Sequence, residues 1–111
     1  MPNRSKEKGT RYERELVNQA LASGIPAKRA YGSNGEAMGE HREADIKVGG
    51  FTGQAKIRES IADYITPSEH VDFQVIREKS GKSFVVIEWW NFLDLLKAAG
   101  VSDETSDNKM G

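Results

Sequence analysis

A glycine pair near the middle of the chain has one notable polar residue before it and two after it. Asp45 precedes Gly49-Gly50, and Gln54 and Lys56 follow it. A two-glycine step between apolar stretches is typical of a two-residue hairpin turn, and such a turn places Asp45 opposite Gln54. Directly opposed residues on one face have Cβ atoms about 4.5–5.5 Å apart, so both side chains are expected to reach a single divalent cation.

The expected chemistry of this face is metal-dependent hydrolysis of a phosphodiester. The Asp45 carboxylate, the Gln54 side-chain oxygen and the Ala55 backbone carbonyl are the hard oxygen ligands that Mg²⁺ prefers. A bound cation polarises the phosphate and acidifies its water. Lys56, on the same face as Gln54, would orient or deprotonate the attacking water and offset the charge of the transition state. The alternative is an exposed hairpin face on which Lys56 pairs with Glu43.

Glu13 points toward the same region from an expected helix. On a helical wheel it lies within the sector of Leu16, Val17 and Ala20, so its side chain is expected to face the sheet. A second interpretation is local: Thr10 and Glu13 match a capping box, in which Glu13 would bond to the Thr10 amide.

The elements expected to position these candidate site residues form a small α/β fold. Apolar spacing, turn residues and β-rich runs predict the order α-β-β-β-α-β-β-α. We expect a mixed central sheet flanked by helices, in the manner of restriction endonucleases. The expected elements are a helix over Thr10 to Ser23, strands over Ile25 to Tyr31, Glu43 to Val48 and Phe51 to Arg58, a short helix over Ser60 to Ile65, strands over His70 to Arg77 and Ser83 to Trp89, and a last helix capped by Asn91.

Composition sets the class of protein. With 37% hydrophobic and 30% charged residues in 111, the chain is expected to form one domain over residues 1–100, with a polar, disordered tail over 101–111. No apolar run suggests a leader or a membrane span, so a cytoplasmic location without membrane contact is expected. Because there is no cysteine, a metal must be held by oxygen or imidazole, which favours Mg²⁺, with Mn²⁺ as a substitute.

Charge is distributed unevenly along the chain. The net charge is −1, but residues 1–31 hold seven Lys and Arg against three Glu. A basic N-terminal third attracts phosphate, although a solvated charged helix explains the same pattern. The candidate DNA contacts in basic positions are Lys8, Arg11, Arg14, Lys28, Arg29 and Arg58.

The ordered set of motifs resembles the archaeal-type Holliday junction resolvases of the PD-(D/E)XK nuclease superfamily. The motifs are Lys8-Gly-Thr-Arg-Tyr-Glu-Arg-Glu15, Arg29-Ala-Tyr-Gly-Ser33, Ala44-Asp-Ile46 and Gln54-Ala-Lys56, and the similarity covers about residues 8–60. The resemblance implies that Glu13, Asp45 and Gln54 hold metal, that Lys56 is catalytic, and that Ser33 lies near the cleaved strand. It also implies a homodimer that cuts a four-way DNA junction symmetrically.

Two departures from the family pattern affect this expectation. Ala44 replaces a common proline, and Gln54 replaces the second acid, which weakens cation binding unless Glu43 or Glu13 compensates. Gln-x-Lys does occur in other branches of the superfamily, including virus-type replication-repair nucleases.

Other functions remain open at this point. The chain could be a repair or restriction-like nuclease on flaps, ends or duplex, or a non-catalytic DNA-binding module with the same fold. His41 beside Glu43 and Asp45 suggests a histidine-based site, which lacks a second histidine nearby. Trp89, Trp90 and Phe92 are expected to pack in the core or a dimer interface, with stacking on unpaired bases as the alternative.

Overall fold

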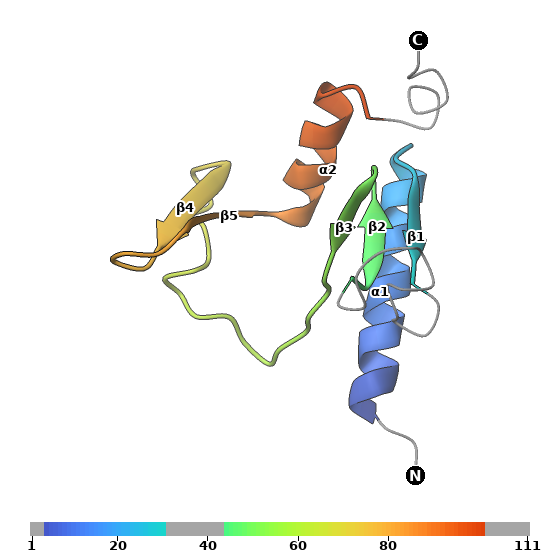
Figure 1. Ribbon diagram of the computed structural model, residues 1–111, viewed down its shortest axis with the longest axis horizontal. Helices are drawn as coiled ribbons and strands as arrows, with labels where there is room; N and C mark the ends of the chain where they lie inside the picture. The colour runs from blue at the N-terminus through green and yellow to red at the C-terminus, as the bar shows by residue number, and fades with distance from the viewer. Residues whose placement is uncertain (1–3, 31–43, 102–111) are drawn as a thin grey trace.

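A computed structural model describes residues 4–30 and 44–101 of the chain. The elements are α1 (Arg4–Ala22), β1 (Ala27–Arg29), β2 (Ile46–Val48), β3 (Phe51–Gly53), β4 (Phe73–Arg77), β5 (Ser83–Ile87) and α2 (Trp89–Ala98) (Figure 1). They form a small α/β protein with two separate antiparallel sheets, of strand order β1-β2-β3 and β4-β5. None of the described helices is long and apolar enough to cross a membrane.

The first helix begins earlier than the sequence predicts. It starts at Arg4 rather than near Thr10, because only Gly9 disfavours a helix in that stretch, at a cost of about 1 kcal/mol. It ends at Ala22, one residue before the predicted Ser23, and Gly24 beyond it has a φ of 83°, the left-handed conformation typical of the residue after a helix. The Ile25 amide then donates to the Ala20 carbonyl at 3.0 Å, which turns the chain toward β1.

The β2–β3 hairpin has the expected register. Gly49 and Gly50 have φ of 61° and 88°, as a type I′ turn requires, and the pairs are Val48 with Phe51, Lys47 with Thr52 and Ile46 with Gly53. β1 pairs with the other edge of β2, which makes β2 the central strand and leaves β3 at an edge.

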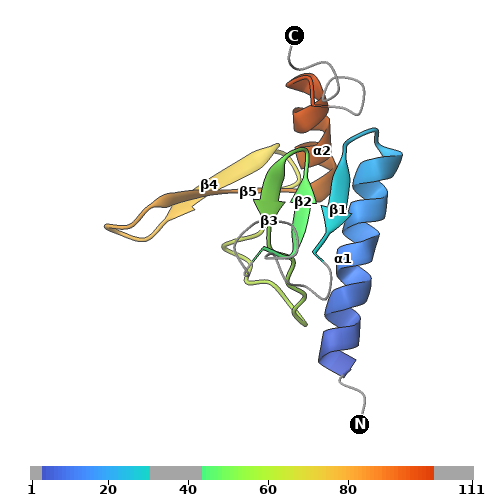
Figure 2. The same ribbon diagram turned by 45° about the vertical axis from the view of Figure 1, so that its right-hand side comes forward.

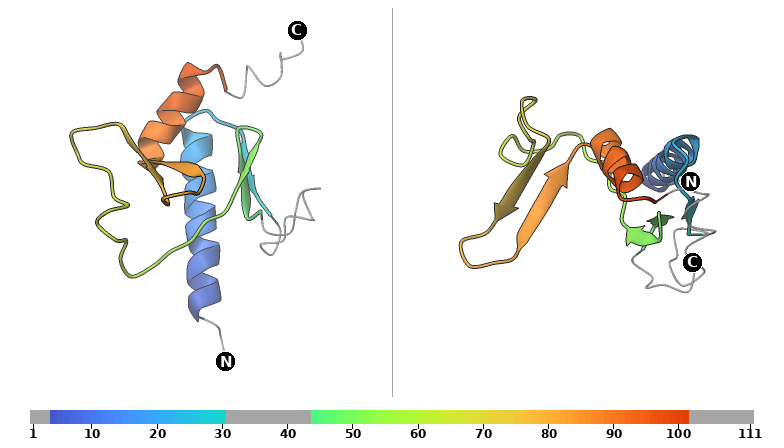
Figure 3. Two further views of the ribbon diagram at one scale, coloured as in Figure 1. Left: turned by 60° about the vertical axis from the view of Figure 1, so that its left-hand side comes forward. Right: turned by 90° about the horizontal axis from the view of Figure 1, so that it is seen from above.

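Both helices contribute to one core over one face of this sheet. The buried cluster comes from α1, the turn after it, β2 and α2, and its members are Leu16, Val17, Ala20, Ile25, Ile46, Val48, Leu93 and Leu96. Figure 3 shows α2 lying beside α1, with the β4–β5 hairpin on the far side of α2. Val101 closes the core from the C-terminal side, where its amide donates to the Leu96 carbonyl.

Three expectations are wrong. Ser60 to Ile65 forms no helix: it contains an isolated turn in which the Ile65 amide donates to Ala62, and so short an exposed segment does not repay the cost of helix nucleation. Asn91 does not cap α2, because the cap residue is Glu88, without a side-chain bond. A mixed central sheet is not formed among the described residues, since the β4–β5 hairpin lies away from β3 (Figures 1 and 2).

Candidate active site

Asp45 lies where all three strands of the first sheet meet. Its amide donates to the Gly53 carbonyl of β3, and its carbonyl accepts from the Ala30 amide beyond β1, both at 2.9 Å. Its carboxylate oxygen Oδ2 accepts the Ala55 amide at 2.9 Å. Asp45 is therefore bonded to the residues on both sides of Gln54 and lies close to it. The strand pairing itself ends at Ile46 and Gly53, so the direct pairing of Asp45 with Gln54 that the sequence predicts is not formed.

The same contact explains why β3 ends early. The sequence predicts a strand up to Arg58, but the strand ends at Gly53. The Ala55 amide is taken by the Asp45 side chain rather than by a carbonyl of β2, so ladder pairing ends at this point. The half-buried carboxylate is thus fixed at the start of the Gln-Ala-Lys segment.

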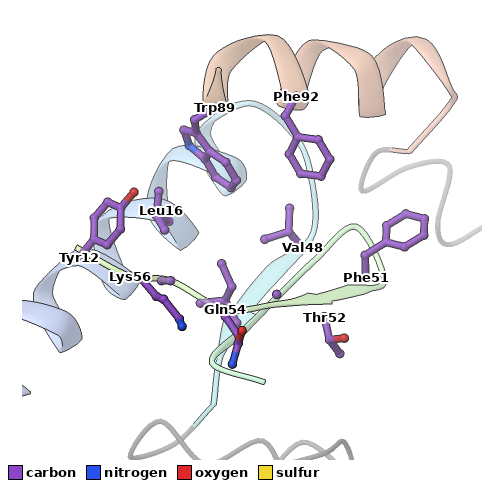
Figure 4. A pocket seen from close by; sticks show the side chains of 12 residues that line it. Tyr12, Leu16, Val48, Phe51, Thr52, Gln54, Lys56, Trp89 and Phe92 are labelled. Carbon is purple, nitrogen blue, oxygen red and sulfur yellow. The ribbon is translucent and has the colours of Figure 1, made fainter. Parts of the chain in front are cut away.

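Gln54 and Lys56 have exposed side chains that point to the same side of the chain (Figure 4). This agrees with the alternation expected from the sequence, although neither residue lies in a regular strand. Ala55, between them, is half-buried and packs against the core. Its side chain thus anchors the segment that presents the Gln54 amide and the Lys56 ammonium group.

Glu13 is buried on the sheet-facing side of α1 and forms an ion pair. Its side chain is 6% exposed, and its Oε1 lies 3.2 Å from Nη1 of Arg29 on β1. It therefore faces the sheet, as the helical wheel predicts. The capping-box interpretation is wrong, because Thr10 lies inside α1 and is not the residue that caps it. Arg29, expected among the DNA contacts, is half-buried with its guanidinium on Glu13.

β1 links the two acids. Arg29 holds the Glu13 side chain, and the next residue, Ala30, donates its amide to the Asp45 carbonyl. Within residues 4–30 and 44–101, no group of three acidic, histidine or cysteine side chains is placed to hold a metal ion. Glu43 and His41, which were considered as further ligands, lie outside the described residues.

The donor set that remains fits Mg²⁺ chemically. Asp45 supplies a carboxylate with an oxygen outside the bond to Ala55, and a carboxylate has about four lone-pair sites, so the Oδ2 bond does not exhaust it. The Gln54 amide oxygen is a second hard ligand on an exposed side chain nearby. The Ala55 carbonyl remains a predicted ligand.

A basic groove lies next to this segment. It is a hollow of about 490 Å³ between the N-terminal half of α1 and the chain after β3, lined by Lys8, Gly9 and residues 55–59. Three of the predicted functional cations, Lys8, Lys56 and Arg58, line it together with the acidic Glu59. Since Ala55 also lines the groove, the Asp45 carboxylate is bonded to one of its walls.

The other predicted DNA contacts do not gather in this groove. Arg11 and Arg14 are exposed on α1, and Lys28 is exposed on β1. Ser33 lies outside the described residues. Lys28 is paired in register with Lys47, a cation that sequence analysis did not single out. Nothing in the sequence indicates this pair, because residues 31–43 separate the strands and leave their register undetermined.

Aromatic residues line a second hollow of about 520 Å³ on the other side of the same segment. Tyr12, Phe51, Trp89 and Phe92 contribute to it, with Gln54, Ala55 and Lys56 at its polar side (Figure 4). The rings of Trp89 and Phe92 lie 5.8 Å apart and pack against the core, as expected for these two residues, whereas Trp90 is exposed. Within the described chain, the buried Nε1 of Trp89 has no hydrogen-bond partner.

Comparison of the chain with models of protein families, with characterised proteins and with solved structures finds no match. The likeness to junction resolvases therefore depends on the motifs of this sequence and on the geometry around Asp45.

Proposed function

We propose that the chain is a Mg²⁺-dependent DNA endonuclease that acts on branched DNA, of the Holliday junction resolvase type. One observation carries the proposal. The Asp45 carboxylate is held on the Ala55 amide, between Gln54 and Lys56, so that an acid, an amide oxygen and an ammonium group converge on one segment. This combination matches the Gln-x-Lys variant of the PD-(D/E)XK pattern.

In this proposal Asp45 and Gln54 hold the metal, and Glu13 and the Ala55 carbonyl are further candidate ligands. A bound Mg²⁺ supplies Lewis acidity at the scissile phosphate and an acidified water. Lys56 orients the attacking water and offsets the negative charge that develops on the phosphoryl oxygens. The exposure of Lys56 leaves it accessible to a substrate strand.

The groove of Lys8, Lys56 and Arg58 supports a nucleic-acid substrate. Three cations line a hollow beside the acidic site, one from α1 and two from the chain after β3, and an extended polyanion such as a nucleic-acid backbone suits such a set. The sequence contains no helix-turn-helix or zinc-finger motif, so recognition would depend on shape and backbone contacts. The restriction-endonuclease fold and the homodimer belong to this proposal.

A second candidate function is a DNA-binding module without catalysis. It is favoured by Gln54, which replaces a carboxylate, and by the lack of a three-acid cluster among the described residues. The two functions differ in whether Mg²⁺ binding depends on Asp45.

The deciding experiment is cleavage of a labelled four-way junction beside matched duplex and flap substrates, in Mg²⁺ and in EDTA. Paired symmetric nicks in the junction alone would establish a resolvase, and cutting of flaps or duplex would indicate a repair or restriction-like nuclease. Binding of all substrates with no cut in either Mg²⁺ or Mn²⁺ would overturn catalysis and leave the binding module.

A further inference from the structure

The β4–β5 hairpin has apolar side chains on both faces. Its register pairs Phe73 with Ile87 and Val75 with Val85 on one face, and Ile76 with Phe84 on the other. Strands with one solvated face alternate apolar and polar residues, whereas strands covered on both faces are apolar throughout. The hairpin therefore has the sequence of an internal strand pair.

Within the described chain, only the connecting segment lies against it: Gln74 donates to the Tyr64 carbonyl at 2.7 Å, and Ile65 lines a hollow with Val86. Figures 1 and 3 show the hairpin standing apart from the first sheet and α1. Phe73, Val75, Val85 and Phe84 are between 54% and 63% exposed. None of residues 49–92 is buried. A lone two-stranded hairpin is marginally stable in water, so this one needs a covering surface.

The exposed large hydrophobic side chains also lie mostly in and around this hairpin. Of the twelve large hydrophobic side chains exposed in the described part, nine lie between Ile57 and Trp90.

The first sheet offers a place for the hairpin. β3 is paired only with β2, so its other edge is free among the described strands. The turn-flanking pair Val48 and Phe51 is hydrogen-bonded, so the next pair is not, and the Thr52 amide and carbonyl point to the free edge. Beside this edge lie the exposed Phe51 ring and the aromatic hollow under Trp89 and Phe92 (Figure 4).

We propose that the β4–β5 hairpin of each chain docks at the β3 edge of a second copy. Each copy carries both the hairpin and the edge, so a two-fold pair forms the same contact twice. Docking extends each three-stranded sheet by a hairpin and brings one apolar face of that hairpin to the aromatic hollow of the other copy. The homodimer itself is part of the proposed function, on which this inference rests; the inference adds the two surfaces that form the dimer, and the mixing test of those surfaces does not require nuclease activity.

The first test is the mass of the full chain by sedimentation velocity over a range of protein concentrations. A species of twice 12.3 kDa is expected. Val75→Glu combined with Phe84→Glu, which places a charge on each face of the hairpin, is expected to give a monomer. Leu21→Glu, at an exposed apolar residue of α1, is the matched control and is expected to remain dimeric.

Mixing two defective variants separates this arrangement from hairpin-to-hairpin contact. Thr52→Pro removes the edge donor, and Phe51→Glu is the second edge variant if Thr52→Pro fails to fold by circular dichroism. Either edge variant mixed with the hairpin variant keeps one intact hairpin and one intact edge, so the mixture is expected to form dimers at concentrations at which each variant alone is monomeric. A compact wild-type monomer, with the hairpin folded onto its own sheet, would overturn the proposal, as would mixtures that stay monomeric.

Discussion

Oδ2 of Asp45 accepts the Ala55 amide at 2.9 Å, so the side chain of one strand replaces a backbone carbonyl of the ladder. The bond ends β3 and fixes the carboxylate beside Gln54 and Lys56. An asparagine oxygen can accept the same bond, so Asp45→Asn tests the role of the carboxylate charge without loss of this structural contact.

Asp45→Asn is accordingly expected to remove cleavage without unfolding the protein. The substitution takes away the charge that holds a cation, and metal catalysis supplies several kcal/mol, so a loss of about 10³-fold or more in the cleavage rate is expected. Cleavage rate and melting temperature should be measured together. Asp45→Ala is the paired variant, and it is expected to lower the melting temperature as well, because the Ala55 amide then loses its partner. Normal cutting by Asp45→Asn would contradict the assignment.

The Glu13–Arg29 pair allows a prediction about stability. Removal of one partner of a buried pair leaves the other charge uncompensated, and because Arg29 keeps 18% of its side chain exposed, the expected loss for Glu13→Ala is about 2–4 kcal/mol in the free energy of unfolding. Urea unfolding measures it, in a double-mutant cycle with Arg29→Ala. Glu15→Ala, exposed on the same helix, should change stability by less than about 0.5 kcal/mol. A coupling energy near zero would show that the pair contributes nothing to stability.

Much of the site follows from local sequence. The glycine pair at 49 and 50 sets the hairpin register from Val48–Phe51 to Ile46–Gly53, which carries Asp45 to the end of β3, where it bonds to Gly53 and Ala55. The helical period turns Glu13 toward the sheet. The alternative, a capping box of Thr10 and Glu13, is excluded by the length of the helix, because a helix that begins at Arg4 has Thr10 in its interior.

The rest depends on contacts between distant segments. Pairing of Arg29 with Glu13 requires the β1–β2 register, which no turn signal encodes. The position of the β4–β5 hairpin depends on its connection through residues 54–72, which contain no helix or strand. Sequence patterns predicted the hairpin itself but not its separation from the first sheet.

The two turn glycines make a matched pair of variants. Both have positive φ, so alanine is strained at either by about 1–2 kcal/mol. At Gly49 a Cβ would also lie 2.8 Å from Cγ1 of Val101, whereas at Gly50 it would meet nothing within 4 Å. Gly49→Ala is therefore expected to destabilise the protein more than Gly50→Ala does in the same urea titration. Equal effects would show that Val101 does not pack against the turn.

The basic groove predicts how DNA binding depends on salt. Each phosphate contact releases counterions and adds about 0.7–0.9 to the slope of log K against log salt concentration. Lys8→Ala and Arg58→Ala, on opposite walls of the groove, are each expected to lower that slope by about 1 and to weaken junction and duplex binding to a similar degree. Fluorescence anisotropy at several salt concentrations, with Mg²⁺ replaced by EDTA, separates this effect from cleavage. Lys97→Ala, in the last turn of α2, is the control of equal charge change and should leave the slope unaltered. If all three variants behave alike, the cations act through net charge, and the groove is not where the backbone binds.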